Sequence, residues 1–265
     1  MKMTSCQAPL MDESCRAIAT YLSERLDEQV LFIEDIDWEE RYRQLDRGEL
    51  DLAWICGGPY VRRVDRGEIA LEPLVAPVWR GERYAGQPVY FSDLIVRGDR
   101  PFRRFADLQG ASWVYNEPGS LSGYEAMRYH LARQGLDGTF FGRVAASGSH
   151  QQSVEWVLAG EAEVSAIDST VLSSLLRRRP ALGEQLRVVE AIGPSPMPPW
   201  VVTSRVPPAT RRAIRQLMTT MNTSAEGQTI LEEAGIARIV EVEDRTYKTT
   251  RAMLQIAETV VIRPG

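Results

Sequence analysis

The sequence predicts an α/β protein of two lobes, each with a mainly parallel sheet flanked by helices. Strand and helix patterns alternate in the opening third and again in the middle of the chain. Two extended runs, 89–97 and 198–205, separate these regions and are expected to be the crossover strands between the lobes. We therefore predict that residues 1–97 begin lobe 1, that 98–198 form lobe 2, and that 199–265 return to lobe 1.

The first lobe starts with a strand pattern around Met3. An amphipathic helix is expected at 12–26, because apolar residues recur there at helical spacing, and the apolar run at 30–33 predicts a buried strand. A second helix at 38–47 ends at a glycine, the usual stop signal, before the next strand at 50–55. This alternation is typical of a parallel sheet covered by helices.

The second lobe repeats the alternation. Its strands are predicted at 112–115, 143–146 and 164–167, and its helices at 123–134, 151–158 and 169–177. Two further helices are expected at 209–222 and 246–259, and both are assigned to lobe 1. Lobes joined by strands move by bending at those strands, so closure around a guest is the expected motion.

The composition argues against several classes of function. The 265 residues carry 31 Lys and Arg against 36 Asp and Glu, and the net charge of −5 disfavours nucleic acid or an anionic membrane as the main partner. No apolar run reaches the ~18 residues of a membrane span, and the N-terminus lacks the apolar core of a signal peptide. We expect a periplasmic or cell-surface location if an export signal has been removed, and the cytoplasm otherwise.

The cysteines point to no special chemistry. Cys6, Cys15 and Cys56 are an odd number without metal-ligand spacing, so neither a disulfide framework nor a zinc site is indicated. We expect no metal and no cofactor. Cys6 and Cys56 each end a predicted strand, and the sequence leaves open whether they meet. Small buried side chains are the simpler interpretation.

Residues 116–124, Asn-Glu-Pro-Gly-Ser-Leu-Ser-Gly-Tyr, say most about function. They close a short strand and open a helix, with hydroxyls at Ser120 and Ser122 and with glycines that let a guest approach the backbone. A helix N-terminus offers free N–H groups and the positive end of the helix dipole, both of which suit an anion. An ordinary helix cap has the same composition, so this segment alone leaves both interpretations open.

A second cluster favours the anion site. Residues 146–150, Ala-Ser-Gly-Ser-His, again end an apolar stretch and precede a helical pattern, about 30 residues further on, as in a βαβ unit. The carboxyl ends of parallel strands meet at one edge of a sheet, where open α/β sheets bind ligands. His150 is therefore a candidate ligand contact. At its ordinary pKa, its imidazolium would hold a dianion best, so affinity should fall as the pH rises past about 6.5.

With these segments placed, the chain resembles the substrate-binding proteins of phosphonate and phosphate-type ABC importers, which have the type 2 periplasmic binding-protein fold. The matching segments follow the family's order, at 48–54, 58–60, 90–96, 105–110, 120–124, 147–150, 160–168 and 198–202. The resemblance implies a non-catalytic protein that closes on a small ligand bearing an oxyanion, such as phosphonate or phosphate, and delivers it to an ABC permease. We expect it to act as a monomer, without nucleic acid and without membrane insertion.

The resemblance also implies ligand contacts. In the family, the serine-rich helix start and the histidine contact the oxyanion, which implies this role for Ser120, Ser122 and His150. Leu121 stands where the family commonly has a third small hydroxyl, which removes one donor and suits another anion or a larger organic one. The further contacts predicted are Tyr90, Tyr124, Asp168 and, as an opposing wall, Trp54 or Tyr60. For each aromatic residue, core packing is the alternative.

Two other functions stay open at this stage. The same fold includes cytosolic dehydratases that act on carboxylate metabolites, and such chemistry would need a general base. By spacing, the candidates for that base are Asp51, Glu117, Asp168 and His150. No Ser-His-Asp order, P-loop or dinucleotide fingerprint supports an enzyme, and we predict none. The remaining alternative is a ligand-sensing domain that reports to a separate regulator.

Overall fold

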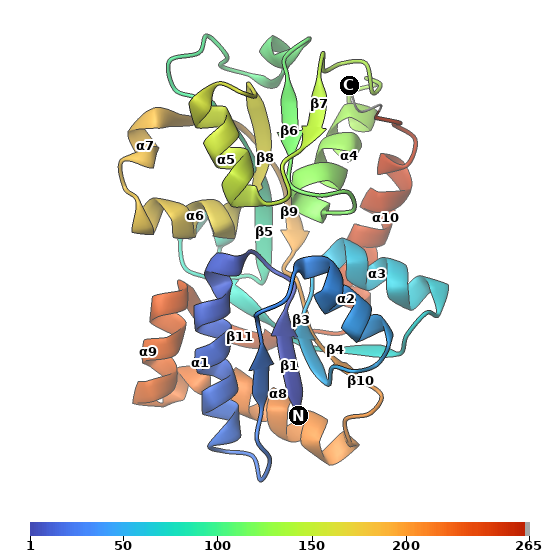
Figure 1. The fold of residues 1–265 in the computed structure, drawn as a ribbon, viewed down its shortest axis with the longest axis vertical. Helices are drawn as coiled ribbons and strands as arrows, with labels where there is room; N and C mark the ends of the chain where they lie inside the picture. Colours follow the sequence, from blue (N-terminus) through green and yellow to red (C-terminus); the bar gives the residue numbers. More distant parts are fainter. Residues whose placement is uncertain (263–265) are drawn as a thin grey trace. The chain divides into compact units, whose positions relative to one another are not determined.

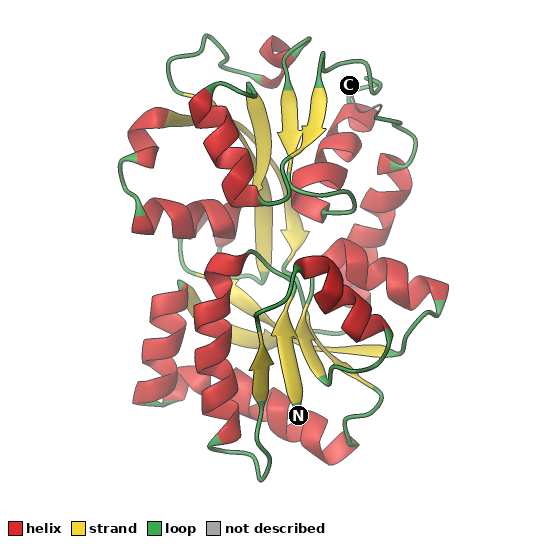
Figure 2. Ribbon diagram, in the orientation of Figure 1, coloured by secondary structure: helices red, strands yellow, loops and turns green. Residues whose placement is uncertain are grey.

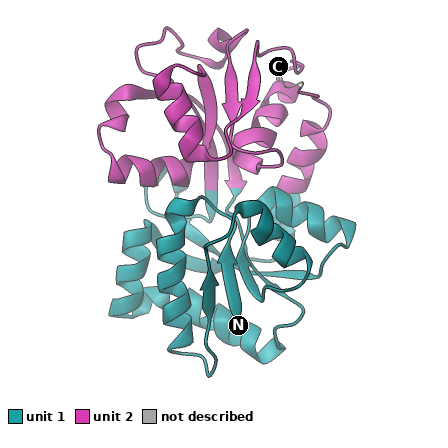
Figure 3. Ribbon diagram, in the orientation of Figure 1, with its two compact units in different colours: residues 1–89, 196–248 teal, residues 90–195, 249–265 magenta. Residues whose placement is uncertain are grey.

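In the computed structural model, which describes residues 1–262, the chain forms two compact units (Figure 3). Unit 1 contains residues 1–89 and 196–248, and unit 2 contains residues 90–195 and those from 249 on. Each unit has its own sheet, so the predicted α/β class is confirmed. Helices border both sheets (Figure 2).

The sheet of unit 1 has the strand order β11-β4-β10-β3-β1-β2 (Figure 1). The strands are β1 Lys2–Ser5, β2 Leu31–Ile33, β3 Leu52–Trp54, β4 Leu71–Trp79, β10 Trp200–Thr203 and β11 Ile236–Glu241. β1 pairs in parallel with β2 and β3, so that Met3 lies opposite both Phe32 and Leu52. β10, β4 and β11 add an antiparallel half to the sheet.

The helices of unit 1 follow from apolar spacing and capping. They are α1 Asp12–Ser23, α2 Trp38–Asp46, α3 Gly57–Arg66, α8 Pro208–Thr219 and α9 Ala225–Ala234. α1 buries Ile18, Tyr21 and Leu22, which recur at helical spacing. α2 begins after Asp37, whose side chain accepts a hydrogen bond from the backbone N–H of Glu40 at 2.6 Å.

The sheet of unit 2 has the strand order β7-β6-β8-β5-β9. The strands are β5 Val89–Arg97, β6 Trp113–Tyr115, β7 Val144–Ala146, β8 Val164–Asp168 and β9 Leu186–Pro196. β6 pairs in parallel with β7 and β8, whereas β5 is antiparallel to β8. Trp113 and Tyr115 of β6 join one hydrophobic cluster and Val114 joins another, so both faces of the sheet are covered.

Helices border this sheet on both sides (Figure 1). They are α4 Ala126–Arg133, α5 His150–Ala159, α6 Ser169–Arg178, α7 Leu182–Gln185 and α10 Lys248–Ala257. Met127 and Leu131 of α4 pack into the cluster of Trp113, whereas Val157 of α5 packs beside Val114. Accordingly, α5 and α6 lie to one side of the sheet, and α4 and α10 lie to the other (Figure 1).

The path of the chain between the units differs from the prediction. It passes from one unit to the other after Val89, Ser195 and Lys248. The expected crossover strand at 198–205 contains β10, which pairs with β3 and β4 inside the sheet of unit 1. The strand that precedes this crossing is β9. An apolar run identifies a strand but does not show which sheet it joins.

The C-terminal segment is a second difference. The sequence assigns the helix at 246–259 to lobe 1, but the chain groups with unit 2 from Thr249 on. The reason is packing, because Val260 and Ile262 are buried in the larger cluster of unit 2. The guanidinium of Arg128 also donates a hydrogen bond to the backbone carbonyl of Val260 at 2.8 Å.

Some elements have weak sequence signals. The patterns do not predict β4, β9, β11, α3 or α9. The strand expected to be buried at 30–33 is the edge strand β2, in which Leu31 is 47% exposed. Within the described part of the chain, no disulfide joins Cys6, Cys15 or Cys56. Within residues 1–262, no helix is long and apolar enough to cross a bilayer, and no His, Cys, Asp and Glu side chains are grouped to hold a metal ion.

Candidate functional site

The carboxyl ends of β6, β7 and β8 lie at one edge of the unit 2 sheet. Tyr115, the last residue of β6, lies opposite Ala146, the last residue of β7. β6 also pairs in parallel with β8, which ends at Asp168. β5 runs the other way, with Ser92 opposite Asp168, so its beginning comes to the same edge. The segments that follow β6, β7 and β8 and the start of β5 therefore meet here, and we call this region the unit 2 edge.

The helix after β6 begins with a widened turn. Ser120 is its N-cap, and its Oγ accepts a hydrogen bond from the Gly123 N–H at 3.2 Å. Residues Leu121–Glu125 form a π-helical turn that continues into α4. Such turns are rare and often occur at functional sites. Ser120 and Ser122 are each 3% exposed.

The helix after β7 begins with an ordinary cap. The Oγ of Ser149 accepts a hydrogen bond from the Gln152 N–H at 3.1 Å. Gly148 precedes it with a φ of +92°, a backbone conformation that favours glycine. His150 is the first residue of α5, so its imidazole lies at the unit 2 edge.

The two helix starts are in contact. The Oγ of Ser122 lies 3.1 Å from the Nε2 of His150, and both side chains are buried. The backbone joins the same segments, because the Gly148 N–H donates to the carbonyl of Asn116 at 2.7 Å. The expected proximity of the two clusters is therefore observed. Their contact with a ligand stays a prediction.

His150 is neutral at physiological pH. Burial lowers the pKa of its imidazole from 6.5 to about 4, because the charged ring would lose its hydration. The expected imidazolium therefore does not form at neutral pH in the ligand-free protein, whereas the predicted loss of affinity past pH 6.5 stays a prediction. Among residues 1–262, the Nδ1 of His150 has no hydrogen-bond partner, so Ser122 and His150 form no Ser-His-Asp triad.

Gly123 and Asn116 approach each other closely. A Cβ on Gly123 would lie 1.8 Å from the Oδ1 of Asn116 and 3.2 Å from the Cε1 of His150. Asn116 is 7% exposed, and within the described part of the chain its Oδ1 has no hydrogen-bond partner. The sequence does not single out these two residues, because Asn and Gly are also ordinary turn formers.

Asp168 and Tyr90 also lie at the unit 2 edge. Asp168 caps α6 by accepting hydrogen bonds from the backbone N–H and the hydroxyl of Thr170, both at 2.7 Å. Burial raises the pKa of its carboxyl to about 6, although the bonds from Thr170 act in the opposite direction. Tyr90 is 1% exposed and lies at the start of β5.

Tyr124 packs against other aromatic rings of unit 2, and Leu121 is buried. The ring centroid of Tyr124 lies 5.8 Å from that of Trp113 and 4.6 Å from that of Tyr115. The guanidinium of Arg128 lies 5.3 Å from the same ring. Core packing, the alternative that the sequence leaves open, accounts for these contacts of Tyr124. Leu121 is 1% exposed.

The predicted contacts in unit 1 are buried with their polar atoms satisfied. The indole N–H of Trp54 donates to the carbonyl of Pro198 at 3.0 Å, and its ring stacks on Trp200 with centroids 5.5 Å apart. The hydroxyl of Tyr60 lies 2.8 Å from the Oδ1 of Asp244. These contacts give both residues a packing role inside unit 1, and their contact with a ligand stays untested.

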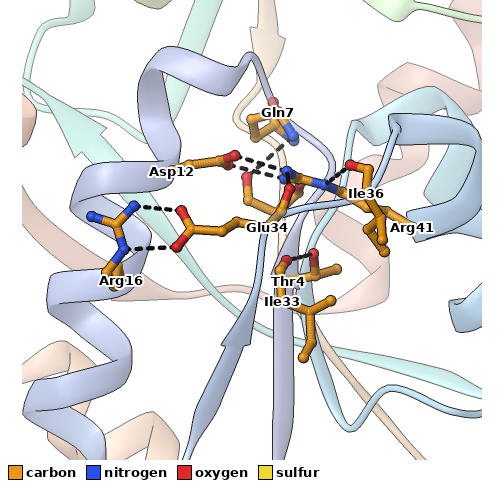
Figure 4. A network of polar contacts seen from close by, with 9 residues as sticks. Thr4, Gln7, Asp12, Arg16, Ile33, Glu34, Ile36 and Arg41 are labelled. Carbon is orange, nitrogen blue, oxygen red and sulfur yellow. Dashed lines mark hydrogen bonds and ion pairs between the residues drawn. The ribbon is translucent and has the colours of Figure 1, made fainter.

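The carboxyl ends of β1 and β2 form a comparable edge in unit 1, and an ion-pair network occupies it (Figure 4). Arg41 is 6% exposed, pairs with both carboxylate oxygens of Asp12 at 3.0 and 2.8 Å, and donates to the Glu34 carbonyl at 2.6 Å. Arg16 pairs with the Glu34 carboxylate. Gln7 differs, because its buried Nε2 has no hydrogen-bond partner within residues 1–262. We call this region the unit 1 edge.

Comparison with known proteins gives a family and a fold. The sequence profile described as "ABC transporter, phosphonate, periplasmic substrate-binding protein" matches residues 3–247. A binding-protein component of an ABC phosphonate transporter from Pseudomonas aeruginosa is 18% identical, with a TM-score of 0.84 over 97% of this chain and 86% of that one. A Prochlorococcus marinus protein in complex with methylphosphonate is 16% identical, with a TM-score of 0.82 over 98% of each chain.

A third structure has the same fold with a lower score. The periplasmic aliphatic sulphonate binding protein of Escherichia coli is 13% identical, with a TM-score of 0.65 over 98% of this chain and 85% of that one. At these identities the structures show the fold, whereas the profile, which spans nearly the whole chain, shows the family. Proteins of this family bind substrates without catalysis, so the family does not favour the dehydratase alternative. The chain therefore belongs to the periplasmic substrate-binding proteins of phosphonate ABC transporters.

Proposed function

We propose that the unit 2 edge binds the oxyanion of a small phosphonate, phosphate or related molecule. The observation that supports this most strongly is the 3.1 Å contact between Ser122 and His150, which joins the starts of two helices. Helix N-termini supply free N–H groups and partial positive charge, and the hydroxyls add further donors. The contacts proposed in unit 2 are Ser120, Leu121, Ser122, Tyr124, His150, Tyr90 and Asp168.

The Ser122–His150 pair presents a donor to an oxyanion in one of its two tautomers. When Nε2 carries the proton, it donates to the Oγ of Ser122, and the serine hydroxyl is free to donate to the ligand. In the other tautomer the serine donates to the ring and turns its lone pairs toward the anion. Binding therefore selects the first tautomer, in which the unpartnered Nδ1 is an acceptor.

Leu121 favours an organic ligand over inorganic phosphate. An apolar side chain there offers an oxyanion no hydroxyl, so the free energy of binding has to come partly from the rest of the ligand. Methylphosphonate, in the Prochlorococcus complex, and an aliphatic sulphonate, named for the E. coli protein, each carry an alkyl group beside a tetrahedral oxyanion. We therefore propose alkylphosphonates and alkylsulphonates as the first candidates.

The cellular role follows from the family. We propose that the loaded protein delivers its ligand to an ABC permease, that it acts as a monomer, and that it does so in the periplasm if exported. Trp54 and Tyr60 of unit 1 are kept as proposed contacts. Capture of a permease from membrane fractions by the loaded protein is the expected result, whereas capture of a regulator alone would favour a sensing role.

A thermal-shift screen tests the ligand class. The panel contains phosphate, phosphite, methylphosphonate, longer alkylphosphonates, alkylsulphonates, nucleoside phosphates and small carboxylates. A ligand at about 100 times its Kd stabilises by about 2.7 kcal/mol, which raises the Tm by a few degrees. We expect shifts with the alkylphosphonates or alkylsulphonates. Shifts with the carboxylates alone would contradict the proposal.

Calorimetry on Ser122→Ala tests the site. The variant loses one hydrogen bond to a charged group, about 1.5 to 3 kcal/mol, so we expect a Kd about ten to a hundred times higher. Ser224→Ala is the matched control, because the Oγ of Ser224 caps α9 in unit 1 by accepting from the Gly227 N–H at 3.1 Å. The control should lose stability and keep its affinity. If Ser122→Ala binds as tightly as the parent, the unit 2 edge is not the site.

A further inference from the structure

Asn116 contacts both helix starts of the unit 2 edge. Its backbone carbonyl accepts a hydrogen bond at 2.7 Å from the N–H of Gly148, in the turn that leads to His150. Its side chain lies against Gly123, in the first turn of the other helix start. One residue that follows β6 thus touches the two segments whose approach creates the Ser122–His150 pair.

The contact at Gly123 leaves no room for a side chain. A Cβ there would lie 1.8 Å from the Oδ1 of Asn116 and 2.9 Å from its Cγ, and real Cβ contacts essentially never fall below 3.0 Å. The next neighbour is the Cε1 of His150 at 3.2 Å. Gly123 is not among the residues with positive φ, so its backbone does not require glycine. Close approach is what excludes a larger residue.

The Oδ1 of Asn116 gains no hydrogen bond from this position. It is buried, and within residues 1–262 it has no hydrogen-bond partner. A buried acceptor without a partner lowers the free energy of unfolding, and such groups are rare in folded proteins. A contribution to stability therefore does not explain why the amide lies here. Its contacts with Gly123 and with the turn before His150 suggest a geometric role.

We infer that Asn116 and Gly123 are positioning residues for the ligand site. The amide of Asn116 packs directly against the Cα of Gly123, and this contact sets the distance between Ser122 and His150. The inference rests on the proposed function of the unit 2 edge. A methyl group at residue 123 displaces Asn116 or His150, and the 3.1 Å hydrogen bond to Ser122 weakens as it lengthens. Removing the Asn116 side chain makes room for that methyl group.

The test is a double-mutant cycle of Gly123→Ala, Asn116→Ala and the double variant, with methylphosphonate titrated by calorimetry. Gly183→Ala is the matched control in unit 2, because its Cβ would meet only the Cδ2 of Leu176, at 3.8 Å. We expect the Kd of Gly123→Ala to rise at least tenfold and that of Asn116→Ala a few-fold, with no change in the control. The double variant should bind more tightly than Gly123→Ala, because the clash is gone.

The ring signals of His150 in NMR spectra, recorded without ligand, provide a second readout. We expect Gly123→Ala to shift the Cε1–Hε1 signal of His150 and the double variant to return it toward the parent position. Asn116→Ala introduces no clash, so it keeps the cycle informative if Gly123→Ala fails to fold. In that case, parent-like affinity and parent-like His150 signals in Asn116→Ala would overturn the inference.

The outcomes separate the inference from the proposed function. If the parent and Gly183→Ala bind no oxyanion, the proposed function fails, while the His150 signals still report whether residues 116 and 123 position the ring. If the parent binds and Gly123→Ala binds equally well, the inference fails and the site stands. Additive losses in the double variant would also overturn the inference, because they show that the two residues do not act on each other.

Discussion

The unit 1 edge and the unit 2 edge differ in how their buried polar groups are satisfied. Both collect polar side chains where parallel strands end and helices begin. In unit 1, the buried guanidinium of Arg41 is bonded to Asp12 and to backbone carbonyls. In unit 2, the Oδ1 of Asn116 and the Nδ1 of His150 have no partners within residues 1–262. An edge that satisfies its own polar groups serves stability, whereas unsatisfied groups indicate capacity for a guest.

The largest expected effect concerns the unit 1 edge. Arg41→Met removes one member of a buried ion pair and leaves Asp12 without its partner, which should lower the free energy of unfolding by about 3 to 5 kcal/mol. Arg16→Met, at an exposed arginine of the same network, is the control and should change little. Urea unfolding measures both. Equal urea midpoints for Arg41→Met and the parent would contradict the statement that the unit 1 edge serves stability.

The second prediction uses the two titrating groups of the unit 2 edge. The folded-state pKa of His150 is about 4, below its ordinary 6.5, so its contribution to stability is complete above pH 6.5 and is lost as the pH falls toward 4. The folded-state pKa of Asp168 is about 6, above its ordinary 3.8, so its contribution is complete below pH 3.8 and is lost as the pH rises through 6. Between about pH 4 and 6, the contribution of His150 to the free energy of unfolding rises with pH and that of Asp168 falls.

Two variants separate these contributions. Relative to the parent, His150→Gln should lose stability as the pH rises from about 4 to 6.5, and Asp168→Asn should gain stability as the pH rises from about 4 to 6. Each unit of pKa difference corresponds to about 1.4 kcal/mol. Denaturant unfolding of the ligand-free protein at a series of pH values measures the difference curves. Parallel curves for parent and variants would show that neither group has a shifted pKa.

The smallest effect is expected at Gln7, the exception in the unit 1 edge. Its Nε2 has no hydrogen-bond partner within residues 1–262, so Gln7→Leu loses no hydrogen bond and should change the free energy of unfolding by less than about 1 kcal/mol. Urea unfolding and methylphosphonate titration measure both properties of the variant. A lower affinity at unchanged stability would assign the unit 1 edge a part in binding, and a large loss of stability would contradict the comparison.

The sequence predicted what depends on local pattern. Glycine and serine after apolar strands located both helix starts, and the register of β6 with β7 brings Ser122 and His150 together as expected. The alternation of strands and helices predicted the parallel part of each sheet. The sequence does not show contacts between distant segments. For this reason β10 was expected to cross between the lobes, and the segment from Thr249 on was assigned to lobe 1.

The sequence also did not predict the charge and the packing of individual side chains. Nothing in the residues around His150 shows that burial keeps its ring neutral, because burial depends on the whole unit. The close approach of Gly123 and Asn116 is likewise a property of packed backbone. Trp54 is a further example: this aromatic residue was predicted to contact the ligand, and its ring stacks on Trp200. For such residues, the sequence leaves open both a ligand role and a role in core packing.

The split of the chain after Lys248 affects how the molecule can be taken apart. Residues 90–195 are contiguous, but their hydrophobic cluster also contains Val260 and Ile262, and a carbonyl at Val260 accepts a bond from Arg128. Expressing 90–195 by itself would expose the surface that those residues cover. A stand-alone fragment for spectroscopy or biosensor engineering therefore needs the segment from 249 onward fused to it by a linker.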